Sequence, residues 1–251
     1  MELRSFFEDH PAGALAFSGG TDSALLVWAA AQYGSNWHAY YVKTPFQPLF
    51  ELNDAETIAA LCDLPLHVIE ADPLADPAIS SNPSDRCYYC KHLIFRTIAR
   101  QAAADGHSLL IDGTNASDLE DDRPGMKALR ELSVRSPLRE CGITKAEVRR
   151  LSREAGLPTW NKPAYACLAT RIPTGTAITR EDLVRIEQGE ALLHELGLRD
   201  FRLRLRGEAA LLQFTEASAP LVQEKQAEIF EMLSPLFSQV HFDSQFRKPS
   251  D

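Results

Sequence analysis

Apolar and polar positions alternate with two different periods along the chain as far as about residue 160. Short apolar runs bounded by turn residues predict buried strands at 14–17, 37–42, 66–69, 108–111 and 132–135. Apolar residues at helical spacing predict helices at 22–32, 55–61 and 93–104. Thr144, followed three residues later by Glu147, predicts a capping box for a helix that runs to about Ala155. Alternating strands and helices are typical of a parallel sheet covered on both faces, so we expect a doubly wound α/β fold.

The pattern changes beyond residue 157. A Pro-rich irregular segment extends to about Ile178, and shorter elements follow it. These are a helix at 180–196, strands at 201–205 and 209–214, a helix at 220–233 and a strand at 240–246. They predict a small α+β domain with an antiparallel sheet. We therefore expect three parts, which are a main domain at 1–165, a linker at 166–178 and a substrate-binding or oligomerisation domain at 179–251.

One glycine-rich segment joins the first predicted strand to the first predicted helix. It comprises Ser18, Gly19, Gly20, Thr21, Asp22 and Ser23. Two glycines allow φ > 0 and a close approach of the backbone to a ligand. The N–H groups at a helix start, with the helix dipole, favour a phosphate or pyrophosphate. Ser18 and Ser23 add hydroxyl donors, and Asp22 is a candidate ligand for Mg²⁺.

This loop lacks the Gly-Lys-Ser/Thr ending of a Walker A motif. It resembles the SGGxDS loop of the ATP-pyrophosphatase (PP-loop) superfamily, whose members cleave ATP between the α and β phosphates. The alternative interpretation is a tight strand-to-helix turn that binds no ligand.

Composition narrows the class of partner. The 251 residues carry a formal net charge of −9, which argues against a protein that grips a nucleic acid through its phosphates. Apolar runs fall short of the roughly 18 residues that a membrane span needs, and the first residues lack the pattern of a secretory signal. We expect a cytoplasmic protein that acts on a small molecule.

Cysteine spacing marks a second candidate site. Cys87 and Cys90 form a C-x-x-C pair, and Cys167 lies far along the chain. Such a pair can bind a metal ion or the edge of an iron–sulfur cluster. Zinc, a redox pair and ordinary unliganded cysteines remain alternatives. Cys62 is most simply a buried small hydrophobe, and Cys141 has no assigned role.

Three longer motifs resemble those of the LarE family. Residues 160–173, WNKPAYACLATRIP, resemble its W-x-K-P-x-x-A-C-L-A-[ST]-R-I-P signature. Asp112-Gly113-Thr114-Asn115, with Asp118 and Arg123-Pro124-Gly125, resembles the second, and Ser136-Pro137-Leu138 resembles the third. Together with the glycine loop, these motifs span most of the chain in the family's order.

The resemblance implies an ATP-dependent sulfur transferase of nickel-pincer nucleotide biosynthesis with a PP-loop domain of the adenine nucleotide α-hydrolase type. Members adenylate a carboxylate of pyridinium-3,5-biscarboxylic acid mononucleotide with release of pyrophosphate, and sulfur then displaces AMP to give a thiocarboxylate. One branch sacrifices the sulfur of a single cysteine. Another holds a 4Fe–4S cluster with three cysteines, and Cys87, Cys90 and Cys167 resemble that branch.

The resemblance also implies roles for single residues. ATP and Mg²⁺ would be bound by the glycine loop, in which Asp22 is catalytic, and by Gly113, Thr114, Asn115 and Asp118. Cys167 would be catalytic as well as a cluster ligand, and Arg171 and Glu190 would serve the substrate.

Arg202 and Arg204 alternate on a predicted strand, so both side chains are expected on one face, where they could hold a phosphate in bidentate fashion. A solvated strand face is the alternative. Family members similarly place an Arg-x-Arg strand here, but the chain departs from them at Thr174, where Tyr is frequent, and at Ala210-Leu211-Leu212-Gln213, where Ala-Arg-Ile-Glu is expected.

Four functions from different classes remain open at this stage. A transfer-RNA thiolase shares the loop and can share a three-cysteine cluster, but the acidic balance and the Cys167 signature argue against it. A synthetase that uses ammonia would leave the cysteines unexplained. A regulatory protein would bind ATP without turnover. We expect the sulfur transferase, acting as a homo-oligomer with a sulfur donor that the sequence leaves unidentified.

Overall fold

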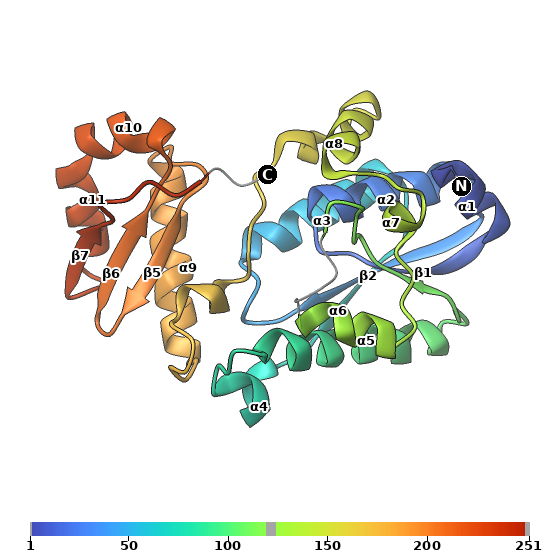
Figure 1. Ribbon diagram of the computed structural model, residues 1–251, viewed down its shortest axis with the longest axis horizontal. Helices are drawn as coiled ribbons and strands as arrows, with labels where there is room; N and C mark the ends of the chain where they lie inside the picture. Colours follow the sequence, from blue (N-terminus) through green and yellow to red (C-terminus); the bar gives the residue numbers. More distant parts are fainter. Residues whose placement is uncertain (1, 119–123, 249–251) are drawn as a thin grey trace. The chain divides into compact units, whose positions relative to one another are not determined.

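The computed structural model describes residues 2–118 and 124–248 (Figure 1). The chain divides into two compact units. The first comprises Met1–Pro73 and Asp85–Lys162, and the second comprises Leu74–Ser84 and Pro163–Asp251. The short segment 74–84 therefore interrupts the first unit in sequence but packs with the second.

A parallel sheet forms the centre of the first unit. Its strands are β1 (Ala12–Ala16), β2 (Asn36–Lys43), β3 (Leu66–Glu70) and β4 (Leu110–Ile111), in the order β3-β2-β1-β4. All pairs are parallel, which confirms the predicted α/β class. The strand expected at 132–135 is wrong, because only an isolated bridge joins Ile111 to Arg135. Ser133 adopts a left-handed φ of 53°, which is incompatible with an extended strand.

Helices cover both faces of this sheet (Figure 1). One layer contains α1 (Leu3–Asp9), α2 (Thr21–Tyr33), α3 (Leu49–Leu61), α7 (Pro137–Glu140) and α8 (Lys145–Glu154). The opposite layer contains α5 (Arg86–Ala104) and α6 (Pro124–Glu131). Because side chains alternate across a strand, Leu15 and Tyr41 pack against the first layer, while Ala14 and Tyr40 pack against α5.

Several helix boundaries differ from those that the pattern predicts. Helix α3 begins at Leu49 rather than at 55, and α5 begins at Arg86 rather than at 93. Cys87 and Cys90 therefore lie within the first turns of a long helix. The start of α8 is confirmed, because Thr144 and Glu147 make both hydrogen bonds of the capping box.

The second unit places helices against a small mixed sheet. Its main helices are α9 (Arg180–Glu195), α10 (Ala219–Glu224) and α11 (Gln226–Leu233), with a short α4 (Pro77–Ser80). Its strands are β5 (Arg202–Arg206), β6 (Ala209–Gln213) and β7 (Gln239–Phe242). Short 3₁₀ turns, at Pro73–Ala75, Pro158–Asn161, Leu168–Arg171 and Glu216–Ser218, complete the two units.

The predicted antiparallel sheet of this unit is only half right. Strands β5 and β6 pair antiparallel, but β6 and β7 pair parallel. The chain reaches β7 through α10 and α11, and a crossover of this kind returns a strand in the parallel direction. The α+β class of this unit is confirmed, but the direction of β7 differs from the prediction. Leu203 and Leu205 of β5 point into the core.

Asn82 joins segment 74–84 to the rest of the second unit. The side-chain amide of Asn82 donates to the carbonyl of Pro173 at 2.9 Å, and the backbone carbonyl of Asn82 accepts from the N–H of Gly175 at 2.8 Å. Asn82 is fully buried with a φ of 57°, a conformation that asparagine tolerates better than most residues. No described helix is both long enough and apolar enough to cross a membrane.

Candidate functional site

The glycine loop turns sharply at Gly19, between β1 and α2. Gly19 has a φ of +74°, and a Cβ added there would lie 2.6 Å from the backbone oxygen of Glu51. Only glycine meets both requirements without displacing its neighbours. Ser18 and Ser23 face each other across the turn, with their hydroxyl oxygens 3.1 Å apart. The turn therefore presents the N-terminus of a long helix at the carboxyl end of β1.

Asp22 is held by two side chains from distant parts of the sequence. Its Oδ1 accepts from Nδ2 of Asn115 at 3.0 Å, and its Oδ2 pairs with Nζ of Lys145 at 2.6 Å. The backbone N–H of Asn115 donates to Asp118 at 3.1 Å, and its Oδ1 accepts from Ser117 N–H at 2.8 Å. The structure thus brings together three residues that sequence reasoning singled out, namely Asp22, Asn115 and Asp118.

The segment after β4 packs directly on the start of α2. A Cβ added at Gly113 would lie 2.9 Å from the backbone nitrogen of Ser23, so this glycine permits the close contact. The carboxylate of Asp112 accepts from the hydroxyl of Thr114 at 2.5 Å and from the hydroxyl of Ser136 at 2.6 Å. Two of the predicted motifs therefore meet beside the glycine loop. Arg123 of the second motif lies outside the described residues.

A cavity of about 560 Å³ opens at these motifs. Its polar wall contains Ser18, Asp22, Ser23, Asp112, Thr114 and Asp118. Its apolar wall contains Tyr40, Val42, Ile94, Phe95, Ile98 and Met126. A pocket with an apolar wall for a ring and a polar end beside a helix N-terminus suits a nucleotide.

Three lysines near this site had no role assigned to them from the sequence. Lys145 pairs with Asp22, and Lys91 lines the cavity. Lys162 pairs with Asp54 at 2.6 Å and donates to the backbone oxygen of Gly19 at 3.2 Å. Lys145 lies inside the predicted capping box, where its sequence context indicated only a helix start. Lys162 lies within the W-x-K-P motif, and its place in that motif was the sequence signal that could have identified it as a site residue.

The cysteines divide between the two units. Cys87 is exposed and lines the cavity, and Cys90 follows three residues later in the same helix. Cys167 belongs to the second unit and is partly buried. Among the described residues, histidines, cysteines and acids form no group of three or more that could hold a metal ion. The three-cysteine ligand set stays a prediction.

The two remaining cysteines lie elsewhere in the first unit. Cys62 and Cys141 are partly buried against the main core, and burial raises the pKa of both thiols. The packing of Cys62 agrees with its interpretation as a small hydrophobic residue.

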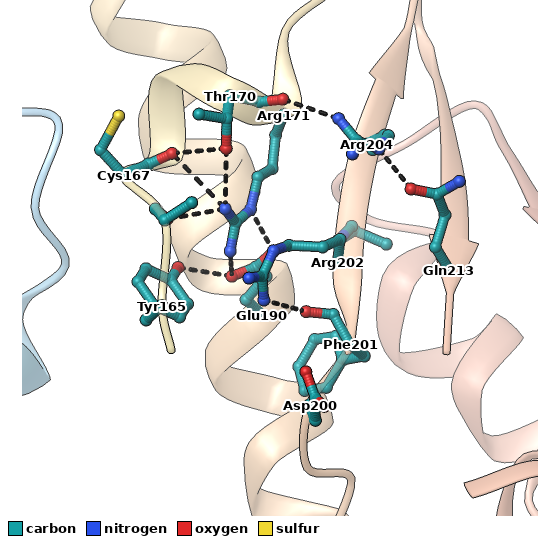
Figure 2. A network of polar contacts seen from close by, with 12 residues as sticks. Tyr165, Cys167, Thr170, Arg171, Glu190, Asp200, Phe201, Arg202, Arg204 and Gln213 are labelled. Atoms are coloured by element: carbon teal, nitrogen blue, oxygen red, sulfur yellow. Dashed lines mark hydrogen bonds and ion pairs between the residues drawn. The ribbon is translucent and has the colours of Figure 1, made fainter. Parts of the chain in front are cut away.

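An ion pair lies at the centre of the second unit (Figure 2). Arg171, which is fully buried, donates to the two carboxylate oxygens of Glu190 at 2.8 and 3.0 Å. Burial alone would lower the pKa of Arg171, but the charge and hydrogen bonds of Glu190 raise it overall. Glu190 also accepts from the hydroxyl of Tyr165 at 2.5 Å and from the N–H of Leu203 at 3.0 Å. This carboxylate therefore ties one loop, one helix and one strand together.

The loop that carries Cys167 is fixed by the same guanidinium group. Arg171 donates to the carbonyl of Ala166 at 2.7 Å and to the hydroxyl of Thr170 at 2.9 Å, and Thr170 donates to the carbonyl of Cys167 at 2.8 Å. Figure 2 shows the sulfur of Cys167 pointing away from these contacts. These contacts hold the backbone of Cys167 in place.

Arg202 and Arg204 lie on one face of β5, as their alternation predicts. Arg202 donates to the carbonyl of Ala164 at 3.0 Å, and Arg204 donates to the carbonyl of Thr170 at 2.8 Å. Burial and the nearby guanidinium groups of Arg171 and Arg247 lower the pKa of Arg202 to about 10. The same causes, with Arg206, lower the pKa of Arg204. Both groups stay protonated at neutral pH, so this face is strongly cationic.

Comparison with known proteins gives three relatives that cover most of the chain. An uncharacterised protein of Synechocystis is 39% identical over 203 residues, which are 80% of this chain and 76% of that protein. The pyridinium-3,5-bisthiocarboxylic acid mononucleotide synthase of Lactiplantibacillus plantarum is 32% identical over 205 residues, which are 81% and 74% of the two chains. An uncharacterised protein of Methanocaldococcus jannaschii is 30% identical over 212 residues, or 84% and 81%. No protein-family model matches the chain.

Proposed function

This chain belongs to the pyridinium-3,5-bisthiocarboxylic acid mononucleotide synthase family, and we propose that it is an ATP-dependent sulfur transferase of the LarE type. Its substrate would be pyridinium-3,5-biscarboxylic acid mononucleotide, which it would convert to a thiocarboxylate for nickel-pincer nucleotide biosynthesis. The observation that carries the proposal is the position of Asp22, bonded to Asn115 and Lys145, at the glycine loop beside a cavity of about 560 Å³.

The first half-reaction would take place in that cavity. A substrate carboxylate attacks the α-phosphorus of ATP, the bond to the bridging oxygen breaks, and pyrophosphate leaves. Backbone N–H groups of the loop would bind the leaving phosphates. The carboxylates of Asp22, Asp112 and Asp118 line the cavity but form no three-acid metal group. Mg²⁺ is usually held by one or two carboxylates together with substrate phosphates, so Asp22 and the phosphates of ATP would fit it. When bound, Mg²⁺ would supply positive charge against the pyrophosphate.

The second half-reaction would replace AMP by sulfur. A carboxylate is a poor electrophile, and adenylation gives it a leaving group, so a sulfur nucleophile can form the carbon–sulfur bond without a strong general base. We propose Cys87, Cys90 and Cys167 as ligands of a 4Fe–4S cluster. The spacing of Cys87 and Cys90 in the first turns of α5 suits two ligands of one cluster. Such a cluster, when bound, would supply an iron that lacks a cysteine and can carry the transferred sulfur. The alternative is that Cys167 gives up its own sulfur.

The nucleotide phosphate of the substrate would be bound in the second unit. Arg202 and Arg204 offer two guanidinium groups on one strand face, a geometry suited to a phosphate. Arg171 and Glu190 would position the groups that bind the substrate. Glu190 accepts a hydrogen bond from Leu203 of β5, and Arg171 donates to the loop that carries Cys167. We expect the enzyme to act in the cytoplasm as a homo-oligomer.

Pyrophosphate release in four assays, three with an added reactant and one with ATP alone, tests the proposal. The purified protein and ATP are assayed with the pyridinium dicarboxylate nucleotide, with transfer RNA, with ammonia, and with ATP alone. We expect release with the pyridinium nucleotide and only background release in the other three assays. Release with transfer RNA or ammonia would replace the proposal with a thiolase or an amide-forming synthetase. Binding of ATP without turnover in any assay would indicate a regulatory protein.

A further inference from the structure

Gln213 separates a guanidinium group from a carboxylate on the cationic face of the second unit. Strands β5 and β6 pair Arg202 directly with Gln213, so this amide lies on the same face as Arg204. Its side-chain oxygen accepts from Nε of Arg204, and its side-chain nitrogen donates to Oδ2 of Asp243 at 2.6 Å. Figure 2 shows Gln213 extended toward Arg204 from the neighbouring strand. The amide therefore uses both of its polar atoms to connect a cation to an anion.

The acidic side chains around this face are already engaged with other groups. Glu190 pairs with Arg171, and Asp200 pairs with Arg247. Asp243 accepts from Gln213 and from the N–H of Gln245, and these hydrogen bonds lower its pKa. Asp243 therefore stays ionised at neutral pH, but the amide of Gln213 is inserted between it and Arg204.

Arg202 and Arg204 are held by neutral groups. Arg202 donates to the carbonyls of Phe201 and Ala164, and Arg204 donates to the carbonyl of Thr170 and to Gln213. Within residues 2–118 and 124–248, neither guanidinium group forms an ion pair with a carboxylate. An arginine that is oriented by carbonyl and amide oxygens is fixed in direction but keeps its full charge for a ligand.

We propose that Gln213 is a positioning residue that orients Arg204 without neutralising it, so that this face selects a dianionic phosphate monoester. The inference rests on the proposed function, in which this face binds the substrate's phosphate. A glutamate at the same place would accept the same hydrogen bond but would form an ion pair with Arg204. It would also set a second carboxylate against Asp243, and two carboxylates this close raise the pKa of one of them.

The test measures binding of nicotinic acid mononucleotide, a pyridinium nucleotide with one phosphate monoester. The full-length protein is used with a non-hydrolysable ATP analogue at saturation, so that the glycine loop is already filled. Affinities of wild type, Gln213→Glu and Gln213→Leu are measured by calorimetry from pH 5.5 to 8. Ratios to wild type are compared at each pH, because the titration of the ligand's own phosphate then cancels.

We expect Gln213→Glu to bind about 10-fold or more weakly than wild type at pH 8, and this loss to become smaller toward pH 5.5 as the carboxylate pair takes up one proton. Gln213→Leu removes the amide without adding charge, so its ratio is expected to stay constant with pH. If wild type binds and Gln213→Glu binds equally well at pH 8, the role of Gln213 is wrong. If wild type itself does not bind, the proposed substrate face is wrong, and this inference with it.

Discussion

In the proposed reaction, Asp22 is the residue on which pyrophosphate release is expected to depend most. Its carboxylate is bonded on both oxygens, to Asn115 at 3.0 Å and to Lys145 at 2.6 Å, and its side chain is 23% exposed. These contacts fix its negative charge at the glycine loop without sealing it from the cavity. A competing role in helix capping finds no support, because Gly20 is the N-cap of α2 and Asp22 lies inside the helix.

Replacement of Asp22 by Asn should lower the rate of pyrophosphate release by at least about 100-fold, because the variant keeps the shape of the site but loses its charge. The free energy of unfolding should fall by about 1–2 kcal/mol, because the variant loses the ion pair with Lys145 and a favourable charge in the first helical turn. Asp63→Asn is the matched control, because Asp63 is exposed and asparagine tolerates its φ of 52°. Normal turnover in Asp22→Asn would remove Asp22 from the catalytic machinery.

The turn between β1 and α2 shows how one element prepares the site. Gly19 combines a left-handed φ of +74° with backbone packing 2.6 Å from where a Cβ would lie. Gly106 has a similar φ of +87° but nothing within 4 Å of that position. The two glycines therefore separate the cost of the backbone conformation from the cost of the close contact.

We expect Gly106→Ala to destabilise the protein by about 1 kcal/mol, the cost of a left-handed backbone at alanine. Gly19→Ala should cost more, roughly 2–3 kcal/mol, since the carbonyl of Glu51 must also move. Urea denaturation of both variants gives the comparison. Equal destabilisation would show that the contact with Glu51 does not constrain the turn.

Local sequence signals predicted the elements that local interactions determine. The capping box of Thr144 and Glu147 marked the start of α8, and the alternation of Arg202 and Arg204 marked a shared strand face. The first turns of α5 were missed, because its N-cap Asp85 makes no side-chain capping bond and residues 86–92 contain no aliphatic side chain to mark a helix face. Element boundaries of this kind depend on tertiary packing rather than on propensity.

The pattern of the sequence did not predict which residues from distant parts of the chain contact each other. The Lys145–Asp22 pair joins residues 123 positions apart, and Lys145 carries no signal besides its place in a capping box. The parallel pairing of β7 likewise depends on a crossover whose direction is not encoded in the strand itself. The family resemblance assigned the glycine loop and residues 113–118 to one site, and the fold supplied the contacts that join them, such as the hydrogen bond from Asn115 to Asp22.

A histidine cluster gives the first unit a pH dependence that is independent of its chemistry. The rings of His38 and His67 are hydrogen-bonded at 3.0 Å, and His107 packs edge-on against His38. Asp105 lies 3.8 Å from His67 and accepts from the hydroxyl of Tyr40 at 2.8 Å. Burial, followed by the neighbouring imidazole, lowers the pKa of both His38 and His107.

Because these folded-state pKa values lie below the unfolded value of about 6.5, the unfolded chain takes up protons first as the pH falls. The histidine contribution to stability is therefore complete above about pH 6.5 and is lost progressively below it. We expect a lower urea midpoint at pH 5 than at pH 7. His107 is buried, and its Nε2 has no hydrogen-bond partner among the described residues. His107→Leu should therefore reduce that difference, whereas His241→Gln, at an exposed position, should not. An unchanged difference in His107→Leu would contradict this origin.

The measurement that most directly tests the account as a whole is mass spectrometry of both nucleotide and protein after turnover with ATP, the pyridinium dicarboxylate nucleotide and sulfide, using anaerobically prepared enzyme. We predict a nucleotide in which one carboxylate oxygen is replaced by sulfur, and a protein of unchanged mass. Loss of one hydrogen sulfide at Cys167 would instead identify that cysteine as the sacrificed donor. A nucleotide that remains unchanged in mass while pyrophosphate is released would contradict sulfur transfer itself.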